Sequence, residues 1–220
     1  MRSATPTMAY QVVVAGARLR MVVLASDGDE SVGVDLGSGA LVRASHPPAA
    51  DVPEPFEVMA GEIAGAVEPF DAGRPEAIEL CDPPELVGSF SPRRAERLLA
   101  RLHHPPQLPL LGLAANAVPY WTLEGDRPSV TVVSLRNDAK LFWGQFGPEC
   151  HFSWQGVDHD LLLTDYRGVA ALESNDLSRP TRADVAQLLG YRPRRLLVML
   201  TRPIDGYCHK AVAALLPGRR

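Results

Sequence analysis

Residues 181–200, TRADVAQLLGYRPRRLLVML, predict a helix followed by a segment whose conformation decides the fold. Thr181 is placed to cap the start of the helix, and Asp184, three residues later, completes a capping box. Gly190 is placed to end the helix in a left-handed conformation. The residues after Gly190 form either a second helix that enters DNA or a buried β-strand, and the two alternatives imply different proteins.

The run from Asp184 to Leu197 resembles the helix-turn-helix of the mercury-resistance regulators and of the lac-repressor class. In those families a second helix follows the glycine and enters the major groove. Residues 196–200 are apolar on every side, whereas a recognition helix presents polar side chains to the bases. A strand over 194–202, joined by a turn at 203–206 to a strand over 208–216, accounts better for this run. The sequence predicts this hairpin, with a DNA-binding helix-turn-helix at 181–200 as the alternative.

Length, charge and cysteine content define the general class of protein. The 220 residues can bury one substantial core or two small ones. A net charge of −4 gives no overall attraction to nucleic acid or to an anionic membrane. Cys81, Cys150 and Cys208 are too few for a disulfide framework, and neither a signal-peptide core nor a membrane-spanning run is present in the sequence. These features predict a cytoplasmic globular protein.

Val-rich runs separated by turn residues predict strands in the N-terminal part, residues 1–45. Segments 32–36 and 40–43, joined by three small residues, are typical of a hairpin. The same stretch, GVDLGSG at 33–39, also resembles the first phosphate-binding turn of sugar-kinase and actin-like ATPases, which implies nucleotide binding. The Pro-rich residues 46–57 predict a connector to a main part over 58–220, with one compact domain overall as the alternative.

Residues 58–67 fit either a helix or a strand, and residues 77–80 predict a short strand. Ser91 and Pro92 predict the start of a second helix, which runs to about Leu102. An antiparallel meander is predicted over 110–113, 120–123, 129–135, 140–146, 150–154 and 161–164. The fold class predicted is α+β, with mostly antiparallel β-sheet or barrel-like sheets and two or three packed helices.

The three tryptophans, Trp121, Trp143 and Trp154, are close together in the sequence. Two of them follow another aromatic residue directly, in the pairs Tyr120–Trp121 and Phe142–Trp143. Adjacent residues of a strand point to opposite faces, so some of these rings are expected outside the core. The sequence predicts that at least one tryptophan lines a surface for a ligand or a partner, the alternative being that all three are core residues.

Arg93, Arg97 and Arg101 recur at helical spacing along the 92–102 helix. Guanidinium groups on one face of a helix can bind anions or the phosphates of nucleic acid. The alternative is an ordinary solvated face opposite an apolar stripe. We expect these arginines to supply positive charge beside the tryptophans.

Catalytic groups are harder to assemble from the sequence. Cys150 and Cys208 each precede a histidine, but adjacent residues of a strand point to opposite faces, so neither cysteine can pair with the histidine that follows it. A thiolate–imidazole dyad would need a cross-pairing, such as Cys208 with His151. Metal-ligating residue types cluster nearby at Asp158, His159, Asp160 and Asp165, without the spacing of a known metal motif. The sequence therefore predicts no catalytic residue, metal or cofactor. The expected role is non-enzymatic binding of a protein or small-molecule partner, and a homodimer is one form of such binding. After the DNA-binding helix-turn-helix, the second alternative is a metal-dependent or Cys/His hydrolase.

Overall fold

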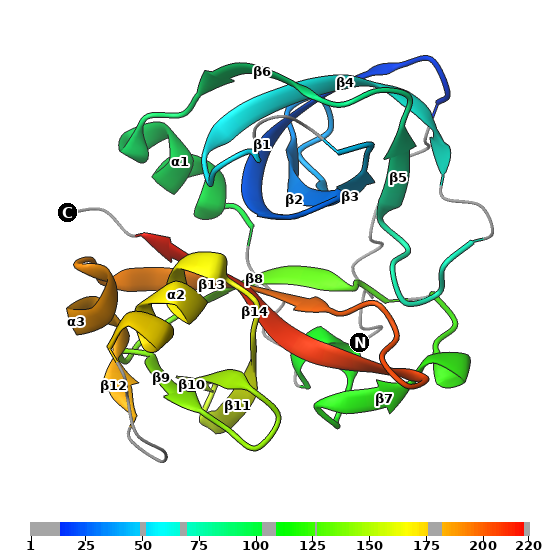
Figure 1. The fold of residues 1–220 in the computed structure, drawn as a ribbon. Helices are drawn as coiled ribbons and strands as arrows, with labels where there is room; N and C mark the ends of the chain where they lie inside the picture. The colour runs from blue at the N-terminus through cyan, green and yellow to red at the C-terminus, as the bar shows by residue number, and fades with distance from the viewer. Residues whose placement is uncertain are drawn as a thin grey trace, which may run out of the picture.

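The structure, a computed structural model, describes residues 14–48, 52–66, 70–102, 109–125, 127–175 and 182–217. The chain forms two β-sheet units that pack against each other (Figure 1). The upper unit is a small barrel, and the lower unit is a second sheet that carries two helices on its left side in this view. The α+β class is confirmed, but both sheets are mixed rather than purely antiparallel.

The barrel closes in the order β1-β2-β3-β5-β4, with β4 pairing back to β1. Its strands are β1 (Arg18–Asp27), β2 (Glu30–Asp35), β3 (Leu41–Ser45), β4 (Glu57–Ala66) and β5 (Ala77–Leu80), and β6 (Glu85–Ser89) pairs with β4 outside the ring. Strands β3 and β5 are parallel, and the other neighbours are antiparallel. Apolar side chains that alternate along these strands, among them Met21, Val42 and Ile78, fill the interior.

The hairpin predicted over residues 32–43 is confirmed as β2 and β3, with Gly33 opposite Val42. The Asp35 carboxylate accepts hydrogen bonds from the backbone N–H groups of Gly37, at 3.1 Å, and Ser38, at 2.8 Å. The Ser38 hydroxyl donates to the same carboxylate at 2.7 Å. The Asp35 carboxylate thus accepts the amide hydrogen bonds that a phosphate would need and stabilises the turn. The resemblance to a phosphate-binding turn is therefore one of sequence.

The Pro-rich connector lies within the barrel unit. Strands β4 and β5 follow it in the chain and pair with β1 and β3, which precede it. The backbone N–H of Phe56 also donates to the Val23 carbonyl at 2.7 Å. Strands on both sides of residues 46–57 therefore belong to one sheet, and the strands of the second sheet follow β6 in the chain. The ambiguity at 58–67 is resolved as a strand over its described residues, 58–66, because they hydrogen-bond to β1 on one edge and to β5 and β6 on the other.

The second sheet has the order β12-β9-β10-β11-β14-β13-β8, and β7 pairs with β14 off this path. Its only parallel pair among the described strands is β11–β14. The strands are β7 (Ala117–Pro119), β8 (Val130–Ser134), β9 (Lys140–Trp143), β10 (Pro148–Trp154), β11 (Val157–Leu163), β12 (Ala183–Asp184), β13 (Pro193–Leu200) and β14 (Tyr207–Pro217).

The segment that decides the fold is confirmed as a hairpin of β13 and β14, with Leu197 opposite Ala214. Strand β13 is apolar on both faces because both faces are covered. Leu196 and Val198 point into the core of the second sheet, whereas Leu197 and Met199 pack toward the barrel. A strand here rules out the recognition helix, so the helix-turn-helix alternative is wrong.

Three α-helices lie in the described ranges: α1 (Pro92–Leu99), α2 (Tyr166–Ser174) and α3 (Val185–Leu189). None of the described helices is long and apolar enough to cross a membrane. Helix α3 ends at Gly190, with φ 70°, as predicted, but Asp184 is its N-cap. The Asp184 carboxylate accepts from the Ala186 N–H at 2.8 Å, and Thr181, the expected cap, lies outside the described residues. The sequence did not predict α2.

Two of the predicted meander strands are short 3₁₀ turns instead, η1 (Leu110–Gly112) and η2 (Tyr120–Thr122). A proline in extended conformation, Pro109 or Pro119, directly precedes each turn. Pro119 is the last residue of β7, and because proline lacks the N–H that a strand ladder needs, the strand ends there and η2 begins. The apolar composition alone did not distinguish these turns from strands.

Candidate functional site

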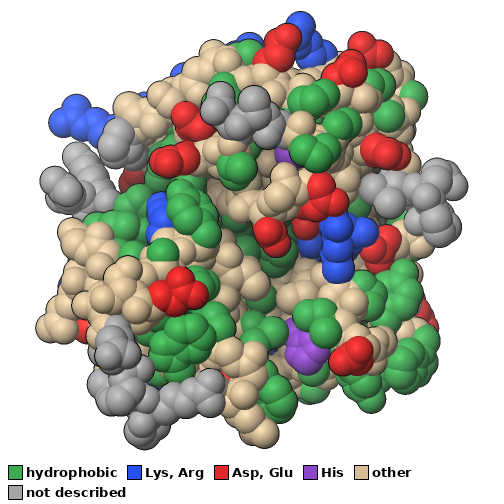
Figure 2. Space-filling view, in the orientation of Figure 1, with side chains coloured by type: hydrophobic (Ala, Val, Ile, Leu, Met, Phe, Trp, Pro, Cys, Tyr) green, Lys and Arg blue, Asp and Glu red, His purple; other side chains and the backbone are tan. Residues whose placement is uncertain are grey.

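Trp121 is the most exposed tryptophan, with 70% of its surface open to solvent on η2. Its ring meets Tyr207 edge to face, with ring centroids 5.8 Å apart. Tyr207 is 42% exposed and Ile204 is 52% exposed, and their backbones pair across the turn between β13 and β14. We call Trp121, Ile204 and Tyr207 the Trp121 surface. Figure 2 shows hydrophobic side chains gathered at the lower right, over this turn and β7.

Backbone contacts hold this surface in shape. The N–H of Tyr120 donates to the Gly206 carbonyl at 2.9 Å, which ties η2 to the β13–β14 turn. Gly206 has φ 82°, and a Cβ at this position would lie 3.1 Å from the Trp121 ring. Glycine therefore satisfies both the turn geometry and the close approach of the ring. The exposed indole is positioned by its neighbours and is not a loose side chain.

Acidic residues border the Trp121 surface. Glu124 follows η2, Asp205 lies between Ile204 and Gly206 in the turn, and both are exposed. The nearest cation in this turn, Arg202, is paired with Asp29 at 3.1 Å. A further exposed ring, Phe70, lies against Gly125 in the segment that follows η2. The area thus combines exposed aromatic rings with a negatively charged rim.

The other two tryptophans belong to the second sheet. Trp143 is half-buried against its core. Trp154 is only 7% exposed and lines one wall of a cavity of about 260 Å³, whose other walls include Arg136 and the outer strand β8. Phe142 takes the opposite face from Trp143, as the alternation predicts, and lies under the guanidinium of Arg182 at 4.8 Å. Of the three tryptophans, only Trp121 forms an exposed surface.

The arginines of α1 do not lie beside the tryptophans. Arg93, Arg97 and Arg101 are exposed, but α1 packs at the upper left of the molecule, whereas β7 and the neighbouring η2 are at the lower right (Figure 1). The fold thus separates two features that the sequence analysis joined into one site. The same helix supplies Glu96, which accepts two hydrogen bonds from Arg195 of β13, at 2.7 and 2.8 Å. The helix therefore also ties the barrel unit to the second sheet.

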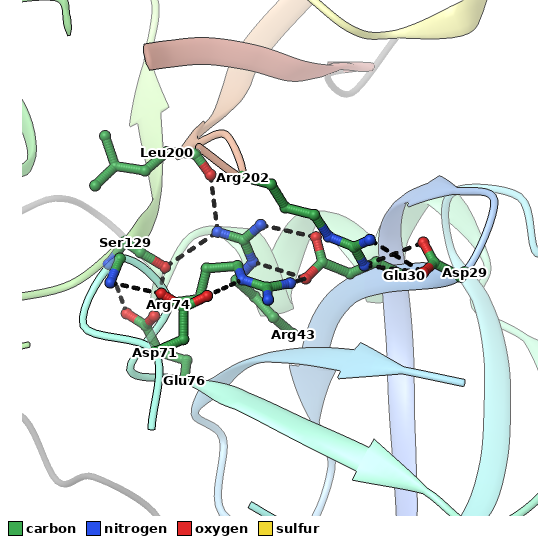
Figure 3. A network of polar contacts seen from close by, with 10 residues as sticks. Asp29, Glu30, Arg43, Asp71, Arg74, Glu76, Ser129, Leu200 and Arg202 are labelled. Atoms are coloured by element: carbon green, nitrogen blue, oxygen red, sulfur yellow. Dashed lines mark hydrogen bonds and ion pairs between the residues drawn. The ribbon is translucent and has the colours of Figure 1, made fainter. Parts of the chain in front are cut away.

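A buried network of charged side chains lies between the barrel and the second sheet (Figure 3). Arg43 of β3 is fully buried and donates to both carboxylate oxygens of Glu30, at 3.2 and 2.7 Å. It also donates to the Ser129 hydroxyl at 3.2 Å and to the Leu200 carbonyl at 2.9 Å. Although burial opposes it, the Arg43 guanidinium lowers the pKa of Glu30. Arg43 thus joins the barrel to β13.

Neighbouring carboxylates complete this network. Arg74 pairs with Glu30 at 3.1 Å and with Asp71 at 2.6 Å. Glu76 accepts from the Ser129 N–H at 2.8 Å and from the Ser129 hydroxyl at 2.6 Å, and burial raises its pKa. Each carboxylate here already has its hydrogen-bond partners inside the protein. The network is therefore a structural joint between the two units.

The residues considered for catalysis are not brought together. Cys208 is buried in the core, whereas His151 lies on the outer face of β10 and pairs with Asp160 at 2.7 Å. Burial raises the pKa of the Cys150 thiol. Asp165 caps α2 through its bond to the Arg167 N–H at 3.0 Å. Within the ranges that the structure describes, no group of three His, Cys, Asp or Glu side chains is placed to hold a metal ion.

Two buried polar residues lie in the second sheet: Lys210, which no sequence motif indicated, and His159, which the sequence indicated only as a metal-ligating residue type. Lys210 of β14 is 2% exposed and donates to the Leu113 carbonyl at 2.6 Å, and burial lowers its pKa to about 8. His159 of β11 is 8% exposed, and its Nε2 atom has no hydrogen-bond partner in the part of the chain that is described. The one available signal was composition, because the chain has 20 arginines but only two lysines, and one of the two lies within an apolar strand.

A five-stranded barrel can bind oligonucleotides on the face of its second and third strands. In this protein, Val32 and Val34 of β2 pack into the same core as Val132 and Leu197 of the second sheet. This face of the barrel is therefore covered from within the chain. The chain matches no protein-family model, no curated protein and no solved structure.

Proposed function

We propose that this protein is a non-enzymatic binding protein that engages a protein partner through the Trp121 surface. The observation that carries this proposal is the indole of Trp121, which is 70% exposed yet held in place by Tyr207 and by the Gly206 turn. Tryptophan and tyrosine dominate the binding energy of protein interfaces, because a rigid ring buries a large area at a small cost in side-chain entropy.

The exposure of this ring favours a macromolecule over a small ligand. Small-molecule sites are concave and enclose most of the ligand. An indole that is 70% exposed, on a turn at the end of the sheet, offers a protruding contact instead. Such a contact fits a complementary apolar pocket or groove on a partner protein.

Charge defines the chemistry of the partner. Glu124 and Asp205 are exposed beside the rings, and the whole chain carries a net charge of −4. A partner segment with an apolar anchor flanked by Lys or Arg matches both the rings and this rim. The proposed partner is therefore a basic protein segment with an exposed apolar anchor.

The proposal is tested with short, dye-labelled peptides in which Leu or Phe is flanked by Lys and Arg, and with matched peptides flanked by Glu. Fluorescence anisotropy should show saturable binding of the basic set alone. Trp121→Ala should weaken that binding about tenfold or more, as expected for an interface anchor. Phe146→Ala is the matched control, because Phe146 is another highly exposed ring (82%), on the turn between β9 and β10. Binding that is indifferent to Trp121→Ala, or absent for both peptide sets, contradicts the proposal.

Sedimentation velocity separates a second copy of the chain from a different partner. We expect the protein alone to sediment as a monomer over the concentrations used for binding. A dimer that Trp121→Ala dissociates would overturn the assignment of a basic partner, because the surface would then serve self-association.

A further inference from the structure

We infer that Lys210 is a reactive amine, placed to form an imine with a small uncharged aldehyde or ketone that enters the core of the second sheet. This site is distinct from the Trp121 surface, and its test is independent of the proposed function.

The choice of lysine at this position is informative. The chain has 20 arginines and two lysines, so cationic roles are given almost entirely to arginine. A guanidinium does not lose its proton in proteins and is a poor nucleophile, whereas a lysine amine does lose it and then reacts with carbonyl carbons. The other lysine, Lys140, is exposed on β9. Lys210, the buried one of the two lysines, is thus a cationic side chain that can become a neutral amine.

The surroundings of Lys210 favour the neutral form. Its side chain is 2% exposed, and within the described residues no carboxylate lies at ion-pair distance from it. In the described part of the chain, its Nζ donates to one backbone carbonyl, that of Leu113, at 2.6 Å. Burial lowers the pKa of Lys210 to about 8, so part of the population is uncharged near neutral pH.

His159 lies close enough to Lys210 to feel its charge. Burial and the Lys210 charge together lower the pKa of His159, so its imidazole is neutral near pH 7. The ring stacks on Phe152 with centroids 5.2 Å apart, and Trp154 lies beyond it at 6.4 Å. Its Nε2 atom is more than nine-tenths buried and has no protein partner among the described residues. An unsatisfied buried nitrogen costs free energy, which a ligand with a hydrogen-bonding group relieves.

The turn that holds Lys210 carries backbone strain. Leu111 of η1 has φ 57°, in the left-handed region that a leucine rarely adopts, and it is fully buried. Such a residue costs about 1 kcal/mol or more, and strained residues cluster at functional sites. Leu113, which accepts the Lys210 hydrogen bond, directly follows this turn, so we expect that a carbonyl compound reaches the amine when η1 shifts. The buried side chains of the second sheet, among them Phe152 and Leu161, are apolar, which favours an uncharged carbonyl compound over a charged one.

The reaction balances without an oxidant or a reductant. The neutral amine of Lys210 adds to the carbonyl carbon, and a proton moves from nitrogen to the former carbonyl oxygen to give a carbinolamine. Loss of water then forms the C=N bond, and the water carries away the carbonyl oxygen and both amine hydrogens. Hydrolysis reverses the reaction and restores the free lysine.

The test uses butanal as the probe and sodium cyanoborohydride to trap the imine, with the folded full-length chain and peptide mapping by mass spectrometry. Lys140 is the internal control in the same molecule. We expect the trapping rate at Lys210 to saturate with butanal concentration, whereas the rate at Lys140 stays proportional to it. Glyoxylate, which is charged, should trap at Lys210 about tenfold less than butanal does. His159→Asn should slow trapping at Lys210 several-fold and leave Lys140 unchanged.

Two results overturn the inference. One is trapping at Lys140 with none at Lys210 in the folded protein. The other is a linear, non-saturating rate at Lys210 that unfolding in guanidinium does not alter. Neither result depends on a Lys210 variant that folds. Lys140→Arg supplies a matched variant, and its trapping at Lys210 should equal that of the parent chain.

Discussion

The guanidinium of Arg43 lies 2.7 Å from the carboxylate of Glu30, and both side chains are buried between the barrel and the second sheet. The pair is joined to β13 by the bond from Arg43 to the Leu200 carbonyl, at 2.9 Å. A buried ion pair adds little stability relative to apolar residues, but loss of one partner leaves the other without its counter-charge. Arg43 therefore holds the two units in one arrangement.

Arg43→Met should lower the free energy of unfolding by about 3 kcal/mol, because among the described residues Glu30 then keeps the ion pair with Arg74 but loses its two hydrogen bonds from Arg43. Urea unfolding followed by circular dichroism measures this loss. Arg202→Ala, which removes the exposed ion pair with Asp29, is the control and should cost less than about 1 kcal/mol. Equal losses for the two variants would show that the buried network does not stabilise the joint.

Gly33→Ala should destabilise the barrel by about 3 kcal/mol, because a Cβ at this position lies 2.2 Å from the Val22 carbonyl oxygen. The neighbour is backbone of β1 and cannot rotate away. Gly65→Ala, in β4 of the same barrel, meets nothing within 4 Å and should change stability by less than about 1 kcal/mol. Thermal unfolding of both variants and of the parent chain measures this difference in stability. Equal stability of the two variants would show that β1 and β2 separate locally and make room for the Cβ.

Trp121→Ala should leave the free energy of unfolding within about 1 kcal/mol of the parent value, since most of the ring is in contact with water. Phe152→Ala removes a fully buried ring from the core of the second sheet and should cost about 3–5 kcal/mol. The same urea titrations compare them. A large loss for Trp121→Ala would mean that the indole serves the fold, and its loss of peptide binding would then carry no information about the surface.

Lys210→Met should be more stable than the parent chain below about pH 8, and this advantage should shrink as the pH rises toward 10. The pKa of Lys210 falls from 10.5 to about 8 on folding, so between these values the unfolded chain binds more protons and the parent gains stability with pH. The full shift corresponds to about 3 kcal/mol. Nearby groups do not mimic this effect, because the lowered pKa of His159 changes stability only below its ordinary value of 6.5, whereas the raised pKa of the Cys208 thiol makes stability fall as the pH rises. Urea titrations at pH 7 and pH 10 measure the change, and a pH-independent difference contradicts it.

The sequence predicted the β13–β14 hairpin because its signal is local. Alternate residues of β13 point into two different cores, so an unbroken apolar run of strand length results. Helix α2 gave no such signal, since Gly168 interrupts its short helical pattern. The glycine allows the helix to approach the sheet, where a Cβ would lie 3.0 Å from Leu163 and 3.1 Å from Leu215.

Of the two candidate sites, one could be predicted from neighbouring residues in the sequence, whereas the other depends on contacts between distant segments. The alternation of adjacent rings predicted an exposed tryptophan, and Trp121 is exposed, although on a 3₁₀ turn and not on a strand. The proximity of Lys210 to His159 depends on the parallel pairing of β11 with β14, which joins segments about fifty residues apart. No pattern within either segment indicates that pairing, so this site could not be predicted from the sequence.

The placement of β14 also constrains the order of events during synthesis. This strand is the last in the described chain, yet it lies inside its sheet and pairs with β7, β11 and β13. The barrel strands β1 to β5 are complete by Leu80 and can close while the ribosome is still translating. Until β14 emerges, the edges of β11 and β13 that pair with it stay open, so we expect the nascent second sheet to be the stage most prone to aggregation.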